Sequence, residues 1–282
     1  MNVIKLREDL KHFLLEDIGE RDVTSSSIFP SSFVGEGNII AKDEGILAGT
    51  SIIRECLHLV DPSIEVILYK HDRDRVLTGE TIATVKGPVI HLLTCERIIL
   101  NLLQRMSGIA TLTNQAVQLL DSSQTKICDT RKTTPGLRMF EKYAVTCGGG
   151  SNHRYGLYDG VMIKDNHIAF AGSIKNAVNA VKANVGHMVK IEVETETKED
   201  VLEAIEAGVD VIMFDNRTPS EIEEFVKLVP SHIVTEASGG ITLEVLHEYG
   251  KTGVNYISLG MLTHSNKALD ISFVTGWKVK GV

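Results

Sequence analysis

From Lys126 onward, short apolar segments alternate with segments whose apolar residues recur at helical spacing. Six of the short segments are predicted strands: Lys126–Thr130, Gly160–Lys164, Val189–Glu194, Val209–Asp215, Ile233–Ala237 and Tyr256–Leu259. Predicted helices lie at Ser173–Ala183, Lys198–Ala207, Pro219–Leu228 and Leu243–Tyr249. The last four strands begin about 20–24 residues apart, which predicts βα units of a parallel barrel. Because a closed barrel of this type needs eight strands, six strands predict a short or open barrel.

The first hundred residues have a different pattern. An opening helix is followed by short strand-like segments at Gly37–Lys42, Gly45–Gly49, Ile64–Tyr69 and Thr81–Lys86. Apolar residues then recur at helical intervals over Val89–Leu120, which predicts a long helix with a break near Ser107 and Gly108. We therefore predict an N-terminal domain over residues 1–107 and a barrel domain over residues 108–267. The C-terminal tail, residues 268–282, is expected to return to the first domain.

Charge and cysteine content exclude several classes of protein. The formal net charge of −8 argues against nucleic-acid binding, which needs a basic face. No apolar run approaches the ~20 residues that cross a bilayer, and the N-terminal residues lack the apolar core of a signal peptide. The four scattered cysteines form no CxxC pair, so we expect reduced, buried thiols. The sequence predicts a cytoplasmic enzyme without nucleic-acid or membrane partners.

Polar residues follow almost every predicted barrel strand. They are Arg131 with Lys132, Lys164, Glu194, Asp215, Ser238, and Ser258 with Gly260. Barrel enzymes build their active sites at the carboxyl ends of the strands, so these side chains are expected to converge. A single polar strand end often means only contact with solvent. Six ends with complementary charges favour an active site.

Cations are concentrated between Asp129 and His167, where six Lys or Arg and two His residues occur. A glycine run such as Gly148–Gly150 is usually an ordinary exposed loop, but here His153, Arg154 and the later Lys164 favour a loop that covers a ligand. In a chain of negative net charge, this local cluster predicts a small, strongly anionic substrate.

Two glycine loops and two acids complete the predicted site. Ala237–Gly240 and Ser258–Gly260 follow the last two strands, where barrels often bind phosphate through backbone N–H groups. Glu194 and Asp215 end neighbouring strands, which indicates contact with Mg²⁺ or ribose hydroxyls. The same acids could instead pair with Lys164 and Lys190, and the two roles are compatible. Lys190 is ambiguous between a structural and a site role.

Several longer motifs resemble those of one enzyme family. They are Thr130–Arg138 (TRKTTPGLR), Glu141–Tyr143, Asn152–Arg154, Met162–His167 (MIKDNH), Glu192–Glu194, Asp215–Asn216, Glu236–Ile241 and Gly260–Thr263. Together they resemble the quinolinate phosphoribosyltransferases, which are type II phosphoribosyltransferases. The resemblance covers nearly the whole chain, and the TRKTTPG and KDNH motifs are highly specific.

This resemblance implies an α/β fold, with an open, incomplete α/β barrel beside an N-terminal α/β sandwich domain. The implied reaction joins quinolinate to phosphoribosyl pyrophosphate with Mg²⁺, and yields nicotinate mononucleotide, pyrophosphate and CO₂ in de novo NAD biosynthesis. No organic cofactor is implied.

The resemblance also implies roles for individual residues. The quinolinate carboxylates would contact Arg131, His153, Arg154 and Lys164, together with Arg97 of the partner subunit. Lys132 would face the phosphoribosyl donor, and Glu194 and Asp215 would meet the ribose and the metal. Lys132, Glu194 and Asp215 are thus the predicted catalytic residues. Ser238, Gly239 and Gly260 would contact the 5′-phosphate, and Thr130, Gly240 and Ser258 complete the predicted substrate-binding set. A shared site implies a homo-oligomer, at least a dimer.

Three other functions fit parts of the pattern. A paralogue on the same scaffold could use nicotinate without decarboxylation, or be the related molybdenum-locus protein. A barrel aldolase could use Lys164 or Lys132 as a Schiff-base nucleophile. A catalytically silent phosphate-binding protein would bind ligand without turnover. The full set of cations for two carboxylates favours quinolinate, and the acids Glu194 and Asp215 argue against a silent protein.

Overall fold

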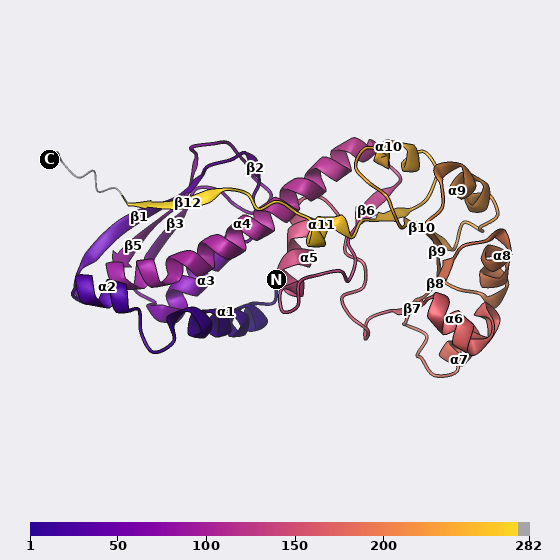
Figure 1. Cartoon of the computed structure of the whole chain (residues 1–282), viewed down its shortest axis with the longest axis horizontal. Helices are drawn as coiled ribbons and strands as arrows, with labels where there is room; N and C mark the ends of the chain where they lie inside the picture. The colour runs from indigo at the N-terminus through magenta and orange to yellow at the C-terminus, as the bar shows by residue number, and fades with distance from the viewer. Residues whose placement is uncertain (276–282) are drawn as a thin grey trace. The chain divides into compact units, whose positions relative to one another are not determined.

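The computed structural model describes residues 1–275, which divide into two compact units (Figure 1). The first unit contains residues 1–112, residues 139–148 and the segment from Ser265 onward. The second contains residues 113–138 and 149–264. The predicted domain boundary between residues 107 and 108 falls inside a helix and stays a prediction.

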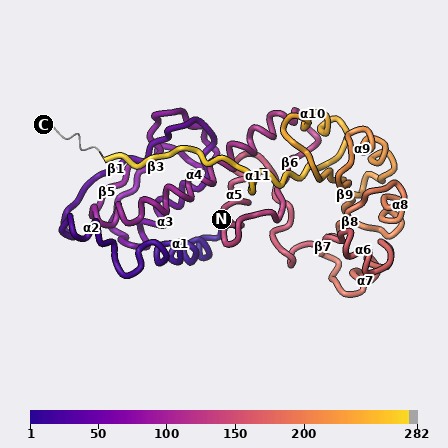
Figure 2. The backbone as a smooth tube through the Cα atoms, in the orientation of Figure 1, coloured from indigo at the N-terminus to yellow at the C-terminus, as the bar shows by residue number. Residues whose placement is uncertain are grey.

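The first unit is built on a four-stranded antiparallel sheet. Its strands follow the order β12-β1-β5-β3. They are β12 (Ile271–Thr275), β1 (Val34–Ala41), β5 (Thr81–Pro88) and β3 (Glu65–Leu68). A smaller pair joins β2 (Gly45–Ile46) and β4 (Arg75–Val76). The pairing of β12 with β1 brings the end of the described chain beside a strand from its first quarter (Figure 2). The part of the predicted tail over residues 276–282 lies outside the described residues.

The first unit also contains helices, most of which bury apolar residues. They are α1 (Val3–Ile18), α2 (Val23–Ile28), α3 (Ser51–Val60) and α5 (Arg138–Cys147). In α1, Leu6, Leu10 and Leu14 are buried, as expected for a stripe repeating every four residues. The Asn2 side chain accepts hydrogen bonds from the first turn of this helix and so fixes where it begins.

The long helix α4 (Val89–Leu120) is continuous, so the predicted break near Ser107 and Gly108 is wrong. The glycine has a packing role instead. A Cβ at Gly108 would overlap the backbone carbonyl oxygen of Lys267. Within the first unit, the missing side chain therefore lets the segment before β12 approach the helix closely.

The second unit contains a six-stranded, all-parallel sheet in the order β6-β11-β10-β9-β8-β7. The strands are β6 (Lys126–Cys128), β7 (Val161–Ile163), β8 (Ile191–Thr195), β9 (Val211–Asp215), β10 (Val234–Ser238) and β11 (Tyr256–Ser258). All six predicted strands are present. Within residues 1–275, the edge strands β6 and β7 do not pair with each other, so the sheet stays open. The predicted α/β class and open, incomplete barrel are confirmed.

Helices follow strands of this sheet, and the last of them lies after its final strand, β11. They are α6 (Asp165–Ala171), α7 (Ile174–Lys182), α8 (Lys198–Ala207), α9 (Pro219–Val226), α10 (Leu246–Tyr249) and α11 (Met261–His264). The prediction for α8 has the observed bounds because both end signals are strong. Thr197 and Asp200 form a capping box at its start, and Gly208 ends it in the left-handed conformation. Among residues 1–275, no helix is both long enough and apolar enough to cross a membrane.

Candidate active site

A cavity of about 530 Å³ opens at the carboxyl ends of the parallel strands of the second unit. Its lining includes Thr130, Arg131, Lys132, His153, Arg154, Lys164, Glu194, Asp215, Ser238, Gly239, Gly240 and Ser258, all predicted site residues. Two further predicted residues are not in this lining. Gly260 lies beside Lys132, since a Cβ on it would be 3.0 Å from the Lys132 Cδ. Arg97 is an exposed residue of α4 in the first unit.

Four lining residues were not predicted to belong to the site: Met162, Met213, Asn216 and Glu236. Three of them lie two positions before a predicted strand-end residue. Side chains on a strand alternate between the two faces, so a residue and its neighbour two positions earlier share a face. Met213 therefore lies below Asp215 on β9, and Glu236 lies below Ser238 on β10. This alternation is the sequence signal that could have predicted these three residues. They form a second row of site residues, deeper in the cavity than the strand ends.

Two guanidinium groups lie close together in the cavity. The pKa of Arg154 is lowered, first by burial and then by the nearby charge of Arg131. The Arg154 Nη1 donates to the carbonyl oxygen of Gly160 at 3.0 Å, which holds the side chain in place. The Arg131 Nε is buried and, within residues 1–275, has no hydrogen-bond partner. Two like charges with an unused buried donor form a binding site for an anion, and forked guanidinium groups suit carboxylates.

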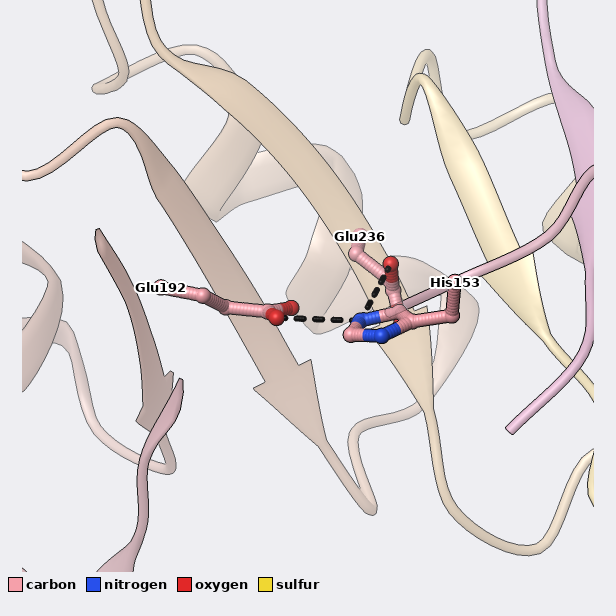
Figure 3. A group of neighbouring side chains, drawn as sticks. All are labelled: His153, Glu192 and Glu236. Carbon is pink, nitrogen blue, oxygen red and sulfur yellow. Dashed lines mark ion pairs between the residues drawn. The ribbon is translucent and has the colours of Figure 1, made fainter. Parts of the chain in front are cut away.

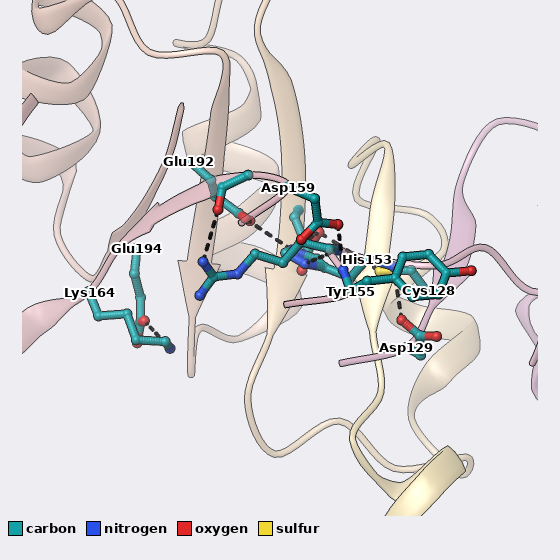
Figure 4. A network of polar contacts seen from close by, with 11 residues as sticks. Cys128, Asp129, His153, Tyr155, Asp159, Lys164, Glu192 and Glu194 are labelled. Carbon is teal, nitrogen blue, oxygen red and sulfur yellow. Dashed lines mark hydrogen bonds and ion pairs between the residues drawn. The ribbon is translucent and has the colours of Figure 1, made fainter. Parts of the chain in front are cut away.

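The carboxylates of Glu194 and Asp215 form a second pair of like charges, which are negative where the guanidinium pair is positive. The pKa of Asp215 is raised, first by burial and then by the neighbouring charge of Glu194. Lys164 Nζ donates to Glu194 Oε2 at 2.7 Å, so one predicted ion pair is present (Figure 4). Lys190 instead pairs with Asp210 at 2.6 Å, which gives it a structural partner at the start of the strands. Oxygen donors that repel each other in this way fit a hard cation such as Mg²⁺.

The loop after β10 has the geometry of a phosphate cradle. Gly239 and Gly240 both have positive φ, +87° and +66°. A Cβ on Gly239 would overlap the Asn216 side chain and approach the Asn216 backbone nitrogen to 2.8 Å. Asn216 itself has φ +53° and donates to Asp215 at 2.6 Å. A residue with a Cβ would displace Asn216, so the glycine at position 239 is what lets this loop approach the end of β9 so closely. Glycine loops at strand ends of this kind are suited to binding phosphate through backbone N–H groups.

Lys132 is exposed, and its backbone is fixed from two sides. Its N–H donates to the Thr130 hydroxyl at 3.0 Å, and its carbonyl accepts from the Thr263 hydroxyl at 2.7 Å. Its backbone is therefore anchored while its ammonium group can reach a ligand in the cavity.

Hydrogen bonds to Asp129 position His153 at the base of the cavity. Asp129 is fully buried, and accepts from the Asn152 side chain at 2.6 Å and from the His153 backbone at 2.9 Å. The Arg154 backbone N–H donates to His153 Nδ1 at 2.8 Å. Since Nδ1 accepts, the proton of the neutral ring is on Nε2.

His153 Nε2 points at two buried carboxylates (Figure 3). Glu192 Oε2 lies 2.9 Å away and Glu236 Oε2 lies 3.7 Å away. Burial, and next the charge of Glu192, raise the pKa of Glu236 to about 7, although His153 opposes the shift. The three residues have the donor types of a metal site. A hydrogen on Nε2 fits the 2.9 Å contact with Glu192. We call them the His153–Glu192–Glu236 cluster.

Comparison with known families and structures agrees with this site. Residues 22–107 match the N-terminal domain of quinolinate phosphoribosyl transferase, and residues 109–274 match the C-terminal domain of the same family. A relative from Bacillus subtilis, a probable carboxylating nicotinate-nucleotide pyrophosphorylase, is 60% identical over 96% of this chain and 94% of its own.

Solved structures show the same fold. NadC from Streptococcus pyogenes has a TM-score of 0.93 at 38% identity, covering 98% of both chains. Human nicotinic acid phosphoribosyltransferase has a TM-score of 0.61 at 12% identity, covering 98% of this chain and 74% of its own. The second likeness concerns the fold alone, so the fold does not decide the substrate. Since the two family matches together span most of its length, the chain belongs to the quinolinate phosphoribosyl transferase family.

Proposed function

We propose that this enzyme transfers phosphoribose from phosphoribosyl pyrophosphate to quinolinate with decarboxylation, as a carboxylating nicotinate-nucleotide pyrophosphorylase. The names of its relatives support this reaction. The observation that carries the proposal is a pair of mutually repelling guanidinium groups in the same cavity as a pair of mutually repelling carboxylates. The first pair suits a dicarboxylate, and the second suits a sugar that becomes positively charged during the reaction.

Binding of quinolinate relieves repulsion among the cations. Two adjacent carboxylates on the pyridine ring would pair with Arg131 and Arg154, with Lys164 completing the contacts. Both ring nitrogens of His153 already have partners, the Arg154 N–H and Glu192, so the predicted contact of His153 with a substrate carboxylate is replaced by a role in holding the wall of the cavity. Each ion pair offsets a charge that is already partly buried, which makes it stronger than an exposed pair. The residues thereby orient the ring nitrogen toward the anomeric carbon of the second substrate.

The glycosyl transfer moves electrons from the ring nitrogen to the anomeric carbon, as the carbon–pyrophosphate bond breaks. Positive charge on the ribose is stabilised by Glu194 and Asp215. Lys132 faces the departing pyrophosphate. Ser238, Gly239, Gly240, Ser258 and Gly260 would hold the 5′-phosphate through backbone N–H groups and hydroxyls. Glu194 and Asp215 would also hold Mg²⁺, which offsets charge on the pyrophosphate when bound.

Positive charge on the product nitrogen then drives loss of CO₂. The bond between C2 and its carboxylate breaks, and the electron pair is stabilised on C2 by the adjacent cationic nitrogen. This requires no organic cofactor.

Turnover with quinolinate, phosphoribosyl pyrophosphate and Mg²⁺ tests the proposal, with CO₂ and nicotinate mononucleotide both measured. We expect equal amounts of each, and negligible product from nicotinate. The Lys132→Ala variant is expected to lower kcat by about 10²–10³-fold, because charge on the leaving group loses a partner. Lys190→Ala is the matched control, since that lysine pairs with Asp210. Faster product formation from nicotinate than from quinolinate would instead identify the non-carboxylating paralogue.

We also propose that Arg97 acts across a subunit interface in a homo-oligomer, at least a dimer. Mixing Arg97→Ala with Arg131→Ala tests this, since each variant alone is expected to be nearly inactive. In a randomly mixed dimer, half of the molecules are hybrids and each hybrid has one intact site, which restores roughly a quarter of wild-type activity. No recovery on mixing, with dimers formed, would place Arg97 in the site of its own chain or outside the site.

We propose the cytoplasm as its location. All four cysteines are buried and none forms a disulfide within residues 1–275, which suits a reducing compartment.

A further inference from the structure

A second cavity of about 410 Å³ lies in the same unit, toward the amino-terminal ends of the strands. Its lining includes Val161, Lys190, Asp210, Val211, His232 and Val234, which begin or precede strands of the sheet. His153, Arg154 and Glu236 line this cavity and the active-site cavity alike. Glu192 lines the second cavity. The His153–Glu192–Glu236 cluster therefore forms the partition between the active site and a separate opening to solvent.

The surroundings of the partition favour a protonated carboxyl group. Glu192 and Glu236 are 5% and 4% exposed, and the Oε1 atom of each is buried without a hydrogen-bond partner within residues 1–275. Two buried carboxylates that share one N–H group are costly to ionise together. The groups that face Glu236 are Glu192 from β8, His153 from the loop after Gly150, and Cys128 from β6, whose Sγ is 3.8 Å from Glu236 Oε2. The charge of His153 opposes protonation there, and hydrogen bonds from Ser258 of β11 and from Cys128 oppose it as well.

The proposed reaction needs a proton at this side of the cavity. When the bond between C2 and its carboxylate breaks, CO₂ leaves and the electron pair remains on C2. A proton must then form the C2–H bond of the product. Until C2 is protonated, CO₂ can recombine with it. A nearby acid that protonates C2 therefore makes the decarboxylation irreversible. In the proposed complex Arg131 and Arg154 pair with the substrate carboxylates, Lys164 also pairs with Glu194 and Lys132 faces the pyrophosphate, whereas Glu236 is a buried acid on the wall.

We propose that Glu236 is the acid that protonates C2, and that it is reprotonated from solvent through the second cavity, past Glu192. This proposal rests on the proposed function. Glu236 gives its proton to C2 and becomes a carboxylate, and solvent that enters the second cavity supplies the next proton to Glu236. His153 acts as a positioning residue, because its Nε2–H holds Glu192 beside Glu236.

The negative charge of the substrate also favours the protonated form of Glu236. Quinolinate brings two negative charges to the cavity that Glu236 lines, which disfavours ionised Glu236 further. An acid is active while protonated, so decarboxylation is expected to slow as the pH rises above the pKa of Glu236 in the complex. The glycosyl transfer does not use this proton and is not expected to slow with it.

The test is a single-turnover experiment with enzyme in excess, in which pyrophosphate and CO₂ are measured separately. In Glu236→Gln, which keeps the shape but lacks the proton, we expect pyrophosphate release within a few-fold of wild type. CO₂ release is expected to slow by about 100-fold or more, with accumulation of the phosphoribosylated quinolinate. Glu236→Asp is expected to recover part of the lost rate.

Glu192→Gln tests the pairing of the two carboxyl groups. Because the charge of Glu192 raises the pKa of Glu236, its loss is expected to make CO₂ release slow at a lower pH than in wild type, with pyrophosphate release less affected. Wild-type enzyme alone gives a further measurement, the ratio of the CO₂ rate to the pyrophosphate rate from pH 6 to 9. A ratio that stays constant, or unchanged CO₂ release in Glu236→Gln, would overturn this proposal while leaving the proposed function intact. Absence of both products from wild type would instead refute the proposed function.

Discussion

Arg131→Ala is expected to lower kcat/KM for quinolinate by about 10³-fold, which corresponds to about 4 kcal/mol of lost transition-state stabilisation. The side chain presents a buried Nε without a partner within residues 1–275, beside Arg154. Alanine removes the guanidinium fork that would bind a carboxylate of the substrate, and so leaves one substrate charge without its partner. The KM for quinolinate should rise as kcat falls, because both the substrate and the transition state carry that carboxylate. Steady-state kinetics with each substrate varied in turn measure the effect.

Arg131→Lys is the matched control for this experiment. Lysine keeps the charge but loses the planar fork, so an intermediate loss of about 10–10²-fold is expected. Equal activities of the lysine and alanine variants would mean that the fork matters and the charge alone does not. Wild-type activity in Arg131→Ala would remove Arg131 from the site.

Gly239→Ala is expected to abolish productive binding of phosphoribosyl pyrophosphate, with a loss of about 10³-fold or more in kcat/KM for that substrate. The new Cβ would overlap the Asn216 side chain, and φ of +87° strains any L residue. Asn216 in turn donates to Asp215, so the strain reaches a carboxylate that is proposed to face the ribose. Calorimetry should show that quinolinate still binds, because the guanidinium pair is on other elements.

Gly240→Ala is the control, because this neighbouring glycine also has positive φ, +66°, but no atom lies within 4 Å of its added Cβ. Its loss is expected to be about tenfold, from backbone strain without a clash. If the two variants lost activity equally, backbone strain alone would explain the effect. Full activity of Gly239→Ala would show that the loop does not hold phosphate.

The strands and strand ends were predictable because their signals are local. Each parallel strand is a short apolar run that ends in a polar residue, and each such end meets the same edge of the sheet. Helix α8 was predicted to the residue because its caps, Thr197 and Gly208, are local as well. Gly108 gave a misleading signal. A glycine within a helical pattern predicts a break in the helix. The structure shows that the carbonyl group of Lys267 packs against Gly108, so the glycine is needed for close packing.

The deeper row of the site was not predicted. Glu192 and Glu236 are separated by more than 40 residues of sequence, and each looks like an ordinary polar position in an apolar strand. Their approach to His153 depends on the register of β8 and β10 with β9 between them, and on the loop that Asp129 holds in place. Which pairs of like charges share a cavity, and whether a carboxyl group keeps its proton, depend on distances and burial.

The sequence by itself determined the open α/β barrel, the residues at the mouth of its cavity and the family to which they point, because these follow from periodicity and from motifs read along the chain. The tertiary structure alone decided which charges repel each other, which glycine has no room for a side chain, and that a buried acid separates two cavities. Pairwise electrostatics and steric overlap depend on separations in space, and these arise only when distant segments have packed together.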